Sequence, residues 1–145
     1  LEFNCRFGDP ETQPIMLRLQ SDLVELCAAA CEGKLDTQQI QFDQRAAVGV
    51  VLAAGGYPDD YRKGDVISGL PTDDNLEAKV FHAGTVLKDG QVLTAGGRVL
   101  CATALGANVT AAQQAAYQLV DQIHWDGVFS RRDIGYRAVA REQQK

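Results

Sequence analysis

Apolar and polar residues alternate along the chain with periods that change from segment to segment. Residues 2–7 alternate strictly, and this period of two predicts a strand with one apolar and one polar face. From Pro14, which we expect at the first helical position, apolar residues recur at helical spacing as far as Gly33. Ser21-Asp22 interrupts this pattern, so the segment is either two abutting helices or one kinked helix. Residues 45–54, small and apolar after the first, predict a strand that is buried on both faces.

The second half of the chain begins with a group of short predicted strands. Residues 78–88 and 91–94 flank Asp89-Gly90, a dipeptide that strongly favours a tight hairpin turn. After a bend at residues 95–97, residues 98–105 predict one more strand. Because these strands follow one another closely, we expect them to form a compact antiparallel meander.

Helical patterns return after the strands. A helix is expected to start near Asn108, where Thr110 and Gln113 have the spacing of a capping box, and a last short element is expected over residues 130–140. This order of elements predicts an α+β fold. The polar, turn-rich residues 34–45 predict a boundary between two structural units.

The composition is that of a globular protein with one core. The chain has 145 residues, of which 46% are apolar and 23% are charged, and these values argue against disorder. A net charge of −5 argues against a surface that binds nucleic acid. No apolar run approaches the roughly 18 residues of a membrane-spanning helix. We therefore expect neither nucleic acid nor a membrane as a partner.

The cysteines and the first residue add two expectations. The four cysteines lie in apolar surroundings without the spacing of metal ligands, so we expect buried free thiols in a reducing cytoplasm. The chain starts with Leu1, not Met, inside a predicted strand, and shows no secretory leader. We expect a fragment or a processed piece of a longer protein.

The polar face of the first strand carries the most specific chemistry. Glu2 and Asn4 offer a carboxylate and an amide oxygen about 6–7 Å apart, and such hard oxygen ligands suit Mg²⁺, which also binds substrate phosphates. Arg6 lies one step further along the same face, where its guanidinium can bind a phosphate or carboxylate oxygen. The alternative is a solvated face of an edge strand.

The residues that follow this strand allow two interpretations. Asp9, Glu11 and Thr12 stand at the start of a predicted helix, where carboxylates and a hydroxyl group can cap the first turn. The same side chains, with exposed N–H groups of the first turn, can instead line a pocket for small substrates. The two roles are compatible, so both stay open.

Later polar positions are also ambiguous. The Gly55-Gly56 loop is either a packing turn or a loose phosphate cradle, since no further phosphate-binding pattern follows it. Arg98, which comes after two glycines, and the pair Arg131-Arg132 are either solvated side chains or contacts for a phosphate group.

Five sequence runs resemble one family of enzymes. The longest is Glu-Phe-Asn-Cys-Arg-Phe-Gly-Asp-Pro-Glu-Thr-Gln-Pro at residues 2–14, and its Glu-x-Asn-x-Arg start is similar to the metal-binding strand of ATP-grasp ligases. Among these ligases, the whole run resembles the phosphoribosylamine–glycine ligase family. Four shorter runs fit the same family: Leu-Ala-Ala-Gly-Gly-Tyr-Pro at 52–58, Tyr-Arg-Lys-Gly at 61–64, Phe-His-Ala-Gly-Thr at 81–85 and Ala-Gly-Gly-Arg-Val at 95–99. The resemblance spans nearly the whole chain but only the C-terminal third of such an enzyme.

The resemblance implies a division of the chain into two parts. Residues 1–35 would form the C-terminal end of an ATP-grasp domain, with its metal-binding strand and a helix. Residues 36–145 would form a small C-terminal domain with a rudimentary hybrid-motif β-barrel or meander and helices. The strands and the lysine that clamp ATP would lie upstream, so the N-terminal remainder of the enzyme is an expected partner and the chain alone is expected to be inactive.

The resemblance also implies an activity in purine biosynthesis. The enzyme would join glycine to 5-phosphoribosylamine through an acyl phosphate, with ATP as co-substrate. Glu2 and Asn4 would hold the Mg²⁺ or Mn²⁺ that bridges the ATP phosphates, and Arg6 would stabilise charge on the phosphoryl group. Asp9, together with Glu11 and Thr12, would help to form the substrate pocket. The alternatives are an ATP-grasp ligase of the carboxylase type, which the Gly-Asp-Pro-Glu-Thr-Gln run disfavours, and a noncatalytic interaction module.

Overall fold

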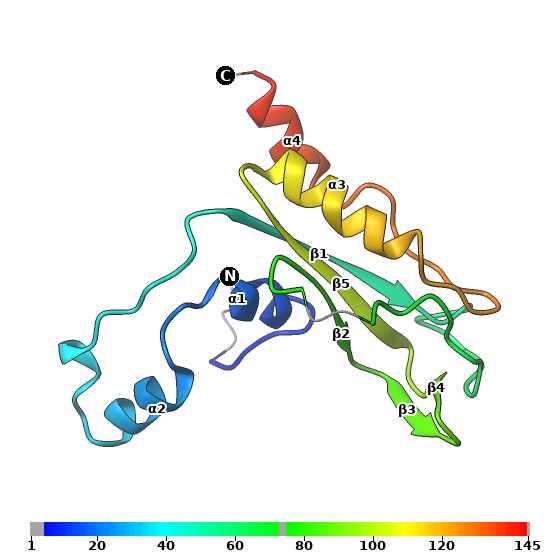
Figure 1. The fold of residues 1–145 in the computed structure, drawn as a ribbon, viewed down its shortest axis with the longest axis horizontal. Coiled ribbons are helices and arrows are strands. Elements are labelled where there is room, and N and C mark those ends of the chain that lie inside the picture. The colour runs from blue at the N-terminus through cyan, green and yellow to red at the C-terminus, as the bar shows by residue number, and fades with distance from the viewer. Residues whose placement is uncertain (1–4, 73–74, 145) are drawn as a thin grey trace.

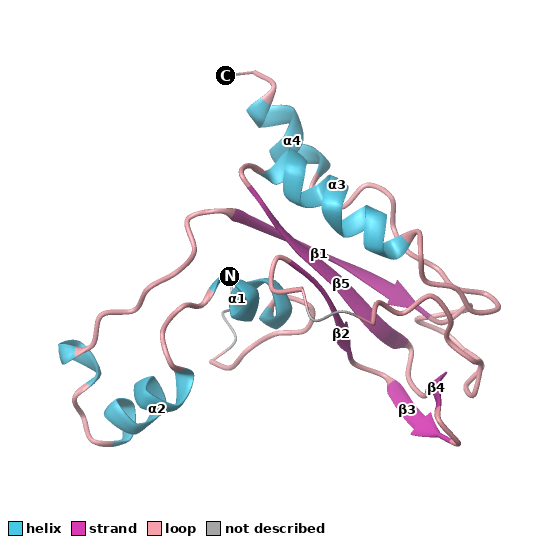
Figure 2. Ribbon diagram, in the orientation of Figure 1, coloured by secondary structure: helices cyan, strands magenta, loops and turns pink. Residues whose placement is uncertain are grey.

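The computed structural model describes residues 5–72 and 75–144 of the chain. The candidate metal ligands Glu2 and Asn4 therefore lie outside the described residues. The described part is an α+β fold, as predicted, and Figure 2 shows its helices and strands. In chain order the elements are α1 (Thr12–Arg18), α2 (Leu23–Cys31), the 3₁₀ helix η1 (Leu35–Thr37), β1 (Ala46–Ala53), β2 (Ala78–His82), β3 (Thr85–Lys88), β4 (Gln91–Thr94), β5 (Arg98–Gly106), α3 (Val109–Val120) and α4 (Tyr136–Glu142).

A three-stranded antiparallel sheet is the centre of the fold (Figure 1). β5 lies between β1 and β2, so that Ala102 is opposite Val50 on one side and Val80 on the other. β5 is buried along most of its length because it has a neighbouring strand at each edge and a helix over each face. The strands predicted over 45–54 and 98–105 are confirmed, with bounds that differ by one residue at most.

α3 covers one face of this sheet (Figure 1). Ala112 and Ala116 of α3 are completely buried in the same apolar core as Val50 and Leu52 of β1. Alanine at these helix positions lets the backbone of α3 approach the sheet closely. The core is therefore closely packed although many of its side chains are small.

α1 packs against the opposite face of β1 and β5. A side chain at Gly49 of β1 would meet Pro14 of α1 at 3.5 Å and the thiol of Cys101 at 3.2 Å, so glycine allows this close approach. The helix starts at Thr12, which places Pro14 at its third position and not at its first. Proline has no backbone N–H, but the third position loses no helical hydrogen bond, because N–H groups of the first turn have no partner in the helix. Asp22 caps α2 with its carboxylate, which makes α1 and α2 two separate helices.

The predicted meander is divided between two sheets. β3 and β4 form a separate hairpin, and its turn is confirmed, since Asp89 and Gly90 both have positive φ angles, of 50° and 76°. The single strand predicted over 78–88 is wrong. It breaks at Ala83-Gly84, where both N–H groups donate to the carbonyl of Val99 and turn the chain out of the first sheet.

Residues 20–44, called the arm below, extend away from the sheet and carry α2 and η1 (Figure 1). The returning chain runs beside α1, where Phe42 forms an isolated bridge with Leu19. The prediction of buried cysteines holds only for Cys101, and burial raises the pKa of its thiol. It is wrong for the other three, which are exposed: Cys5, Cys27 and Cys31. Apolar sequence neighbours do not bury a residue unless another element packs on them.

The N-terminus of α3 is capped differently from the prediction. Asn108 caps the first turn with its side-chain oxygen, and Glu142 of α4 accepts hydrogen bonds from the backbone N–H groups of Val109 (2.7 Å) and Thr110 (3.1 Å). Gln113 does not join a capping box, because its amide donates to a backbone carbonyl just before α4. Among the described residues, none of the helices has the length and apolar character that a membrane crossing requires.

Candidate functional site

A small cleft lies on the same face of the sheet as α1. Its volume is about 240 Å³. Alternate residues of β1 form its apolar floor, and residues from the loops before α1, after β1 and before α4 surround them. Two guanidinium groups complete a lining that consists of Pro10, Gly49, Val51, Ala53, Tyr57, Arg98, Phe129, Arg131 and Ile134.

Arg98 meets Asp9 beside the cleft. Arg98 Nε lies 3.1 Å from Asp9 Oδ2, and Arg98 Nη1 donates to the Asp9 carbonyl oxygen at 3.4 Å. Both side chains are partly exposed, so the ion pair adds little stability and acts mainly by orienting the guanidinium. Arg98 Nη2 has no hydrogen-bond partner among the described residues and can donate to a ligand in the cleft.

Arg131 lines the cleft from the loop before α4. Its guanidinium forms a fork with Asp133, with distances of 2.9 and 2.7 Å, and this contact holds the pKa of the Asp133 carboxyl below its usual range. The backbone of this loop is held by the Tyr117 hydroxyl, which donates to the Arg131 carbonyl at 2.8 Å and accepts from the Ile134 N–H at 3.1 Å. The loop therefore presents Arg131 from a fixed backbone.

Two further contacts shape the walls of the cleft. Ala53 and Phe129 exchange backbone hydrogen bonds of 2.8 and 2.9 Å, which places the segment before α4 alongside β1. Tyr57 packs so closely over Gly97 that a side chain at Gly97 would collide with the tyrosine ring. The glycine next to Arg98 thus keeps an aromatic wall close to the guanidinium.

The structure brings together some of the predicted site residues. Asp9 and Arg98, from opposite halves of the chain, are in contact, and Arg131 lines the same cleft. Arg132 does not line the cleft, because its guanidinium pairs with Asp121 at 2.6 Å. A cleft lined by two guanidinium groups over an apolar floor suits a small molecule with a phosphate or carboxylate group.

The other described site residues lie outside this cleft. Arg6 is exposed, donates to the carbonyl of Phe7 at 3.1 Å, and forms no ion pair with a described carboxylate. The Thr12 hydroxyl donates to the Gly8 carbonyl at 2.5 Å. Glu11 is exposed and forms no cap hydrogen bond with α1, so capping by this carboxylate is not observed.

Sequence reasoning missed the role of several apolar residues. The Gly55-Gly56 segment is a turn, as one of the two interpretations predicted, and it positions Tyr57 in the wall of the cleft. Phe129 had no signal in the sequence, because its contact with β1 joins segments far apart in the chain. Gly49 interrupts the larger apolar residues of β1, and this gap could have indicated a close approach to that face.

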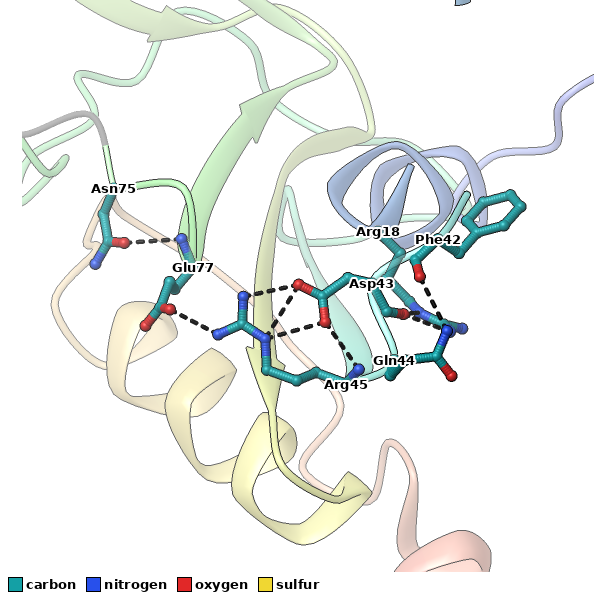
Figure 3. Close-up of polar contacts among 7 residues, drawn as sticks. All are labelled: Arg18, Phe42, Asp43, Gln44, Arg45, Asn75 and Glu77. Atoms are coloured by element: carbon teal, nitrogen blue, oxygen red, sulfur yellow. Dashed lines mark hydrogen bonds and ion pairs between the residues drawn. The ribbon is translucent and has the colours of Figure 1, made fainter. Parts of the chain in front are cut away.

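A second polar cluster attaches the arm to the sheet, away from the cleft (Figure 3). Arg45 forms a fork with the Asp43 carboxylate, with distances of 2.8 to 3.1 Å, and also donates to Glu77 at 2.6 Å. Arg18 donates twice to the Asp43 carbonyl, at 3.0 and 2.8 Å. Hydrogen bonds from Arg45 lower the pKa of Asp43 from 3.8 to about 2. The cluster is structural, and in the described ranges no group of three or more His, Cys, Asp or Glu residues could hold a metal ion.

The fold and the cleft define a small α+β domain with two arginine side chains in the lining of one cleft. The sequence model of the family described as "Phosphoribosylglycinamide synthetase, C domain" matches residues 47–137. Because this match covers most of the chain, the chain belongs to that family. The resemblance found in the sequence runs is thus confirmed.

Relatives named phosphoribosylamine–glycine ligase are similar to the chain over nearly all its residues. The relative from Vibrio cholerae serotype O1 is 71% identical over 145 residues, and that from Escherichia coli K12 is 66% identical over 144 residues. The crystal structure of the ligase of that name from Thermotoga maritima has a TM-score of 0.73 and 38% identity over 92% of this chain. The chain spans 34% of the length of these two curated relatives and 32% of the Thermotoga maritima chain.

Proposed function

We propose that this chain is the C-terminal part of an ATP-dependent ligase that joins glycine to 5-phosphoribosylamine in purine biosynthesis. Membership of the family over residues 47–137 carries this proposal, and the names of the similar relatives support it. The cleft adds physical support. Arg98 and Arg131 suit a phosphate group, and the carboxylate of Asp9 suits an amine, so the two ends of phosphoribosylamine find complementary groups.

The reaction needs positioning and charge stabilisation more than an enzyme nucleophile. The carboxylate of glycine is a poor electrophile, so the terminal phosphoryl group of ATP is first transferred to a carboxylate oxygen, and ADP leaves. The amine of phosphoribosylamine then attacks the carbonyl carbon of this acyl phosphate and loses a proton, and inorganic phosphate leaves. The product is glycinamide ribonucleotide. No covalent bond to the protein forms at any step.

The residues of the first strand supply the charge stabilisation in this proposal. Glu2 and Asn4 would hold a Mg²⁺ or Mn²⁺ ion, because a carboxylate and an amide oxygen are ligands that such hard cations prefer, and the ion would neutralise charge on the ATP phosphates. Arg6 is exposed and is unpaired with any described carboxylate, so its guanidinium is available to stabilise charge on the transferring phosphoryl group.

The substrate pocket is proposed to start where this strand ends. Asp9, which is oriented by Arg98, would bind the amine of a substrate. Glu11 and Thr12 are proposed to complete the pocket from the start of α1. The hydroxyl of Thr12 already donates to Gly8, so it would act towards a substrate as a hydrogen-bond acceptor.

The same proposal assigns the two parts of the chain. Residues 1–35 would end an ATP-grasp domain, and residues 36–145 would be the C-terminal domain with a rudimentary hybrid-motif barrel. The exposed apolar side chains of Leu23 and Val24 support the first assignment, and the two small antiparallel sheets support the second. The four free cysteines support a reducing compartment, so we place the protein in the cytoplasm.

The test is an assay of the full-length gene product. We expect sustained formation of ADP only when both glycine and phosphoribosylamine are present, because the amine is needed to consume the acyl phosphate. Arg6→Met should lower kcat by about 100-fold or more, whereas Lys34→Met, an exposed charge on the arm, should leave it unchanged. ADP formation with bicarbonate in place of glycine would identify a ligase of the carboxylase type, and no ATP-dependent reaction at all would favour a noncatalytic module.

A further inference from the structure

The helix α3 has a second contact face besides the one that packs on the sheet. Ala112 and Ala116 are buried in the core. Gln113 and Tyr117, each one position further along the helix, lie one turn apart on a neighbouring face. Both side chains form hydrogen bonds with the loop that precedes α4. This face of α3 therefore attaches the loop to the rest of the molecule.

The Tyr117 hydroxyl bridges two backbone groups of this loop. It donates to the Arg131 carbonyl at 2.8 Å and accepts from the Ile134 N–H at 3.1 Å. The Gln113 amide donates to the Ile134 carbonyl at 2.6 Å, so side chains of α3 bind both backbone groups of Ile134. Arg131 and Ile134 both line the cleft. The hydroxyl thus fixes the backbone from which two lining side chains project.

The ion pair of Arg131 lies entirely within the bridged loop. Its partner is Asp133, two residues later, and the two side chains are 65% and 51% exposed. This pair orients the guanidinium relative to the loop, but it does not attach the loop to another element. The place of the guanidinium in the cleft therefore depends on the contacts between the loop and α3.

A second charged contact of the loop is a weaker attachment. Arg132 pairs with Asp121 at the end of α3, and the two side chains are 62% and 58% exposed, so this ion pair adds little stability. Arg132 also lies over the Tyr117 ring, at 5.5 Å from its centroid. The contact of the hydroxyl with Ile134 is partly buried, where a lost hydrogen bond is replaced less easily by water.

We propose that Tyr117 is a positioning residue for the phosphate group of phosphoribosylamine, and that it acts through Arg131. The inference rests on the proposed function, in which the cleft binds this substrate. Tyr117 does not line the cleft, so it acts without touching the ligand. Without the hydroxyl the loop would adopt more conformations, and Arg131 would lose more conformational entropy on binding an anion.

The test compares Tyr117→Phe with the wild type in the full-length protein. This substitution keeps the aromatic ring under Arg132 and removes only the hydroxyl. The probe is ribose 5-phosphate, which carries the sugar and the phosphate of the substrate but lacks its amine. We expect Tyr117→Phe to raise the Kd of this probe by about 3- to 10-fold in calorimetry, the effect of one lost hydrogen bond. Gln118→Ala, at an exposed residue of the same helix, should leave the Kd unchanged.

A double-mutant cycle separates positioning from general stabilisation. If the hydroxyl acts through Arg131, Tyr117→Phe should have no further effect on the Kd in an Arg131→Met background. Its effect on the free energy of unfolding, measured by urea denaturation, should be the same in both backgrounds. An equal effect on the Kd in both backgrounds would overturn the proposal. An unchanged Kd in Tyr117→Phe, or a wild type that does not bind the probe, would overturn it as well.

Steady-state kinetics distinguishes this inference from the proposed function. In an active ligase, Tyr117→Phe should raise the KM for phosphoribosylamine and leave the KM for ATP unchanged, because the ATP site is proposed to lie at the first strand and upstream. An equal rise in both KM values would refute this inference alone. A protein without ligase activity, whose Kd values nevertheless follow the double-mutant cycle, would refute the proposed function alone.

Discussion

At the residue scale, Arg98 and Arg131 are alike, because an aspartate orients the guanidinium of each. Asp9 pairs with the guanidinium of Arg98, and Asp133 pairs with that of Arg131. Each guanidinium keeps further N–H groups that can bind a ligand, and both side chains line the cleft. A guanidinium oriented in this way loses little side-chain entropy when it binds an anion. The aspartates also balance the charge of an empty cleft.

A substitution of Arg98 tests this arrangement in the full-length enzyme. We expect Arg98→Met to raise the KM for phosphoribosylamine by roughly 10- to 100-fold, the value of one charged hydrogen bond, with a smaller change in the KM for ATP. The control is Arg132→Met, since Arg132 is next to a cleft residue but pairs with Asp121. Steady-state kinetics that show no difference between the two variants would remove Arg98 from the substrate site.

Asp43 makes a prediction about acid stability. Hydrogen bonds from Arg45 lower its pKa from 3.8 to about 2, so the ionised carboxylate stabilises the folded state at pH values above its ordinary pKa. This contribution is lost as the pH falls from about 4 to about 2. In Asp43→Asn, the free energy of unfolding should therefore fall less steeply across this range than in the wild type. Urea denaturation at a series of pH values measures the slope.

The matched control for Asp43 is Asp59→Asn, on an exposed turn where the described residues provide no ion pair. This variant should retain the slope of the wild type. If Asp43→Asn also retains it, the Asp43–Arg45 contact contributes no pH-dependent stability, and the interaction shown in Figure 3 would be a surface contact without effect.

At the scale of elements, α4 completes the cap of α3. The Glu142 carboxylate accepts hydrogen bonds from two backbone N–H groups at the start of α3 and from the Thr110 hydroxyl at 2.9 Å. The negative charge also interacts favourably with the positive end of the α3 dipole. A short terminal helix thereby helps to hold α3 against the sheet and keeps the nearby loop with Arg131 in place.

Removal of this carboxylate should weaken the fold measurably. We expect Glu142→Ala to lower the free energy of unfolding by about 1–3 kcal/mol, because two partly buried N–H groups lose a charged acceptor. Chemical denaturation measures this change, and amide exchange of Val109 and Thr110 should become faster. Gln143→Ala, at the exposed next residue, should be neutral. Equal stability of both variants would show that water replaces the carboxylate fully.

At the scale of the whole molecule, the described residues form two hollows with different linings. The cleft beside Asp9 has two guanidinium groups in its lining, whereas a groove between α1, α2 and the returning chain of the arm is lined by apolar side chains and the thiol of Cys27. Both surfaces border α1 or the residues just before it. In the proposed ligase, α1 therefore lies between the substrate cleft and this apolar groove.

This arrangement predicts that the 145-residue chain alone is catalytically inert. We expect no ADP formation from the isolated chain with ATP, glycine and phosphoribosylamine, because the residues expected to clamp ATP precede Leu1 in the relatives. Co-expression with the upstream part should restore product formation. Turnover by the isolated chain would contradict the proposal that the ATP site lies upstream. If the two co-expressed parts fold correctly but form no product, the proposal that they assemble into an active enzyme would be contradicted.

Several features could be predicted because they depend on neighbouring residues alone. The periods of apolar residues defined β1 and β5, and Asp89-Gly90 defined a hairpin turn that needs two positive φ angles. The helical pattern of the arm was also correct, but its burial was not, since Cys27 and Cys31 are exposed. Local periodicity indicates which face of an element is apolar and does not indicate what covers that face.

The amino-acid sequence by itself determined the α+β class, the main strands and the family of this protein, because short-range patterns and shared motifs carry that information. Only the tertiary structure decided that Arg98 meets Asp9, that Arg98 and Arg131 line one cleft, and that Glu142 caps α3. These contacts join residues from different elements, and their geometry follows from how the elements pack on the sheet. Polar side chains have several partners of suitable charge in the chain, and packing selects one of them.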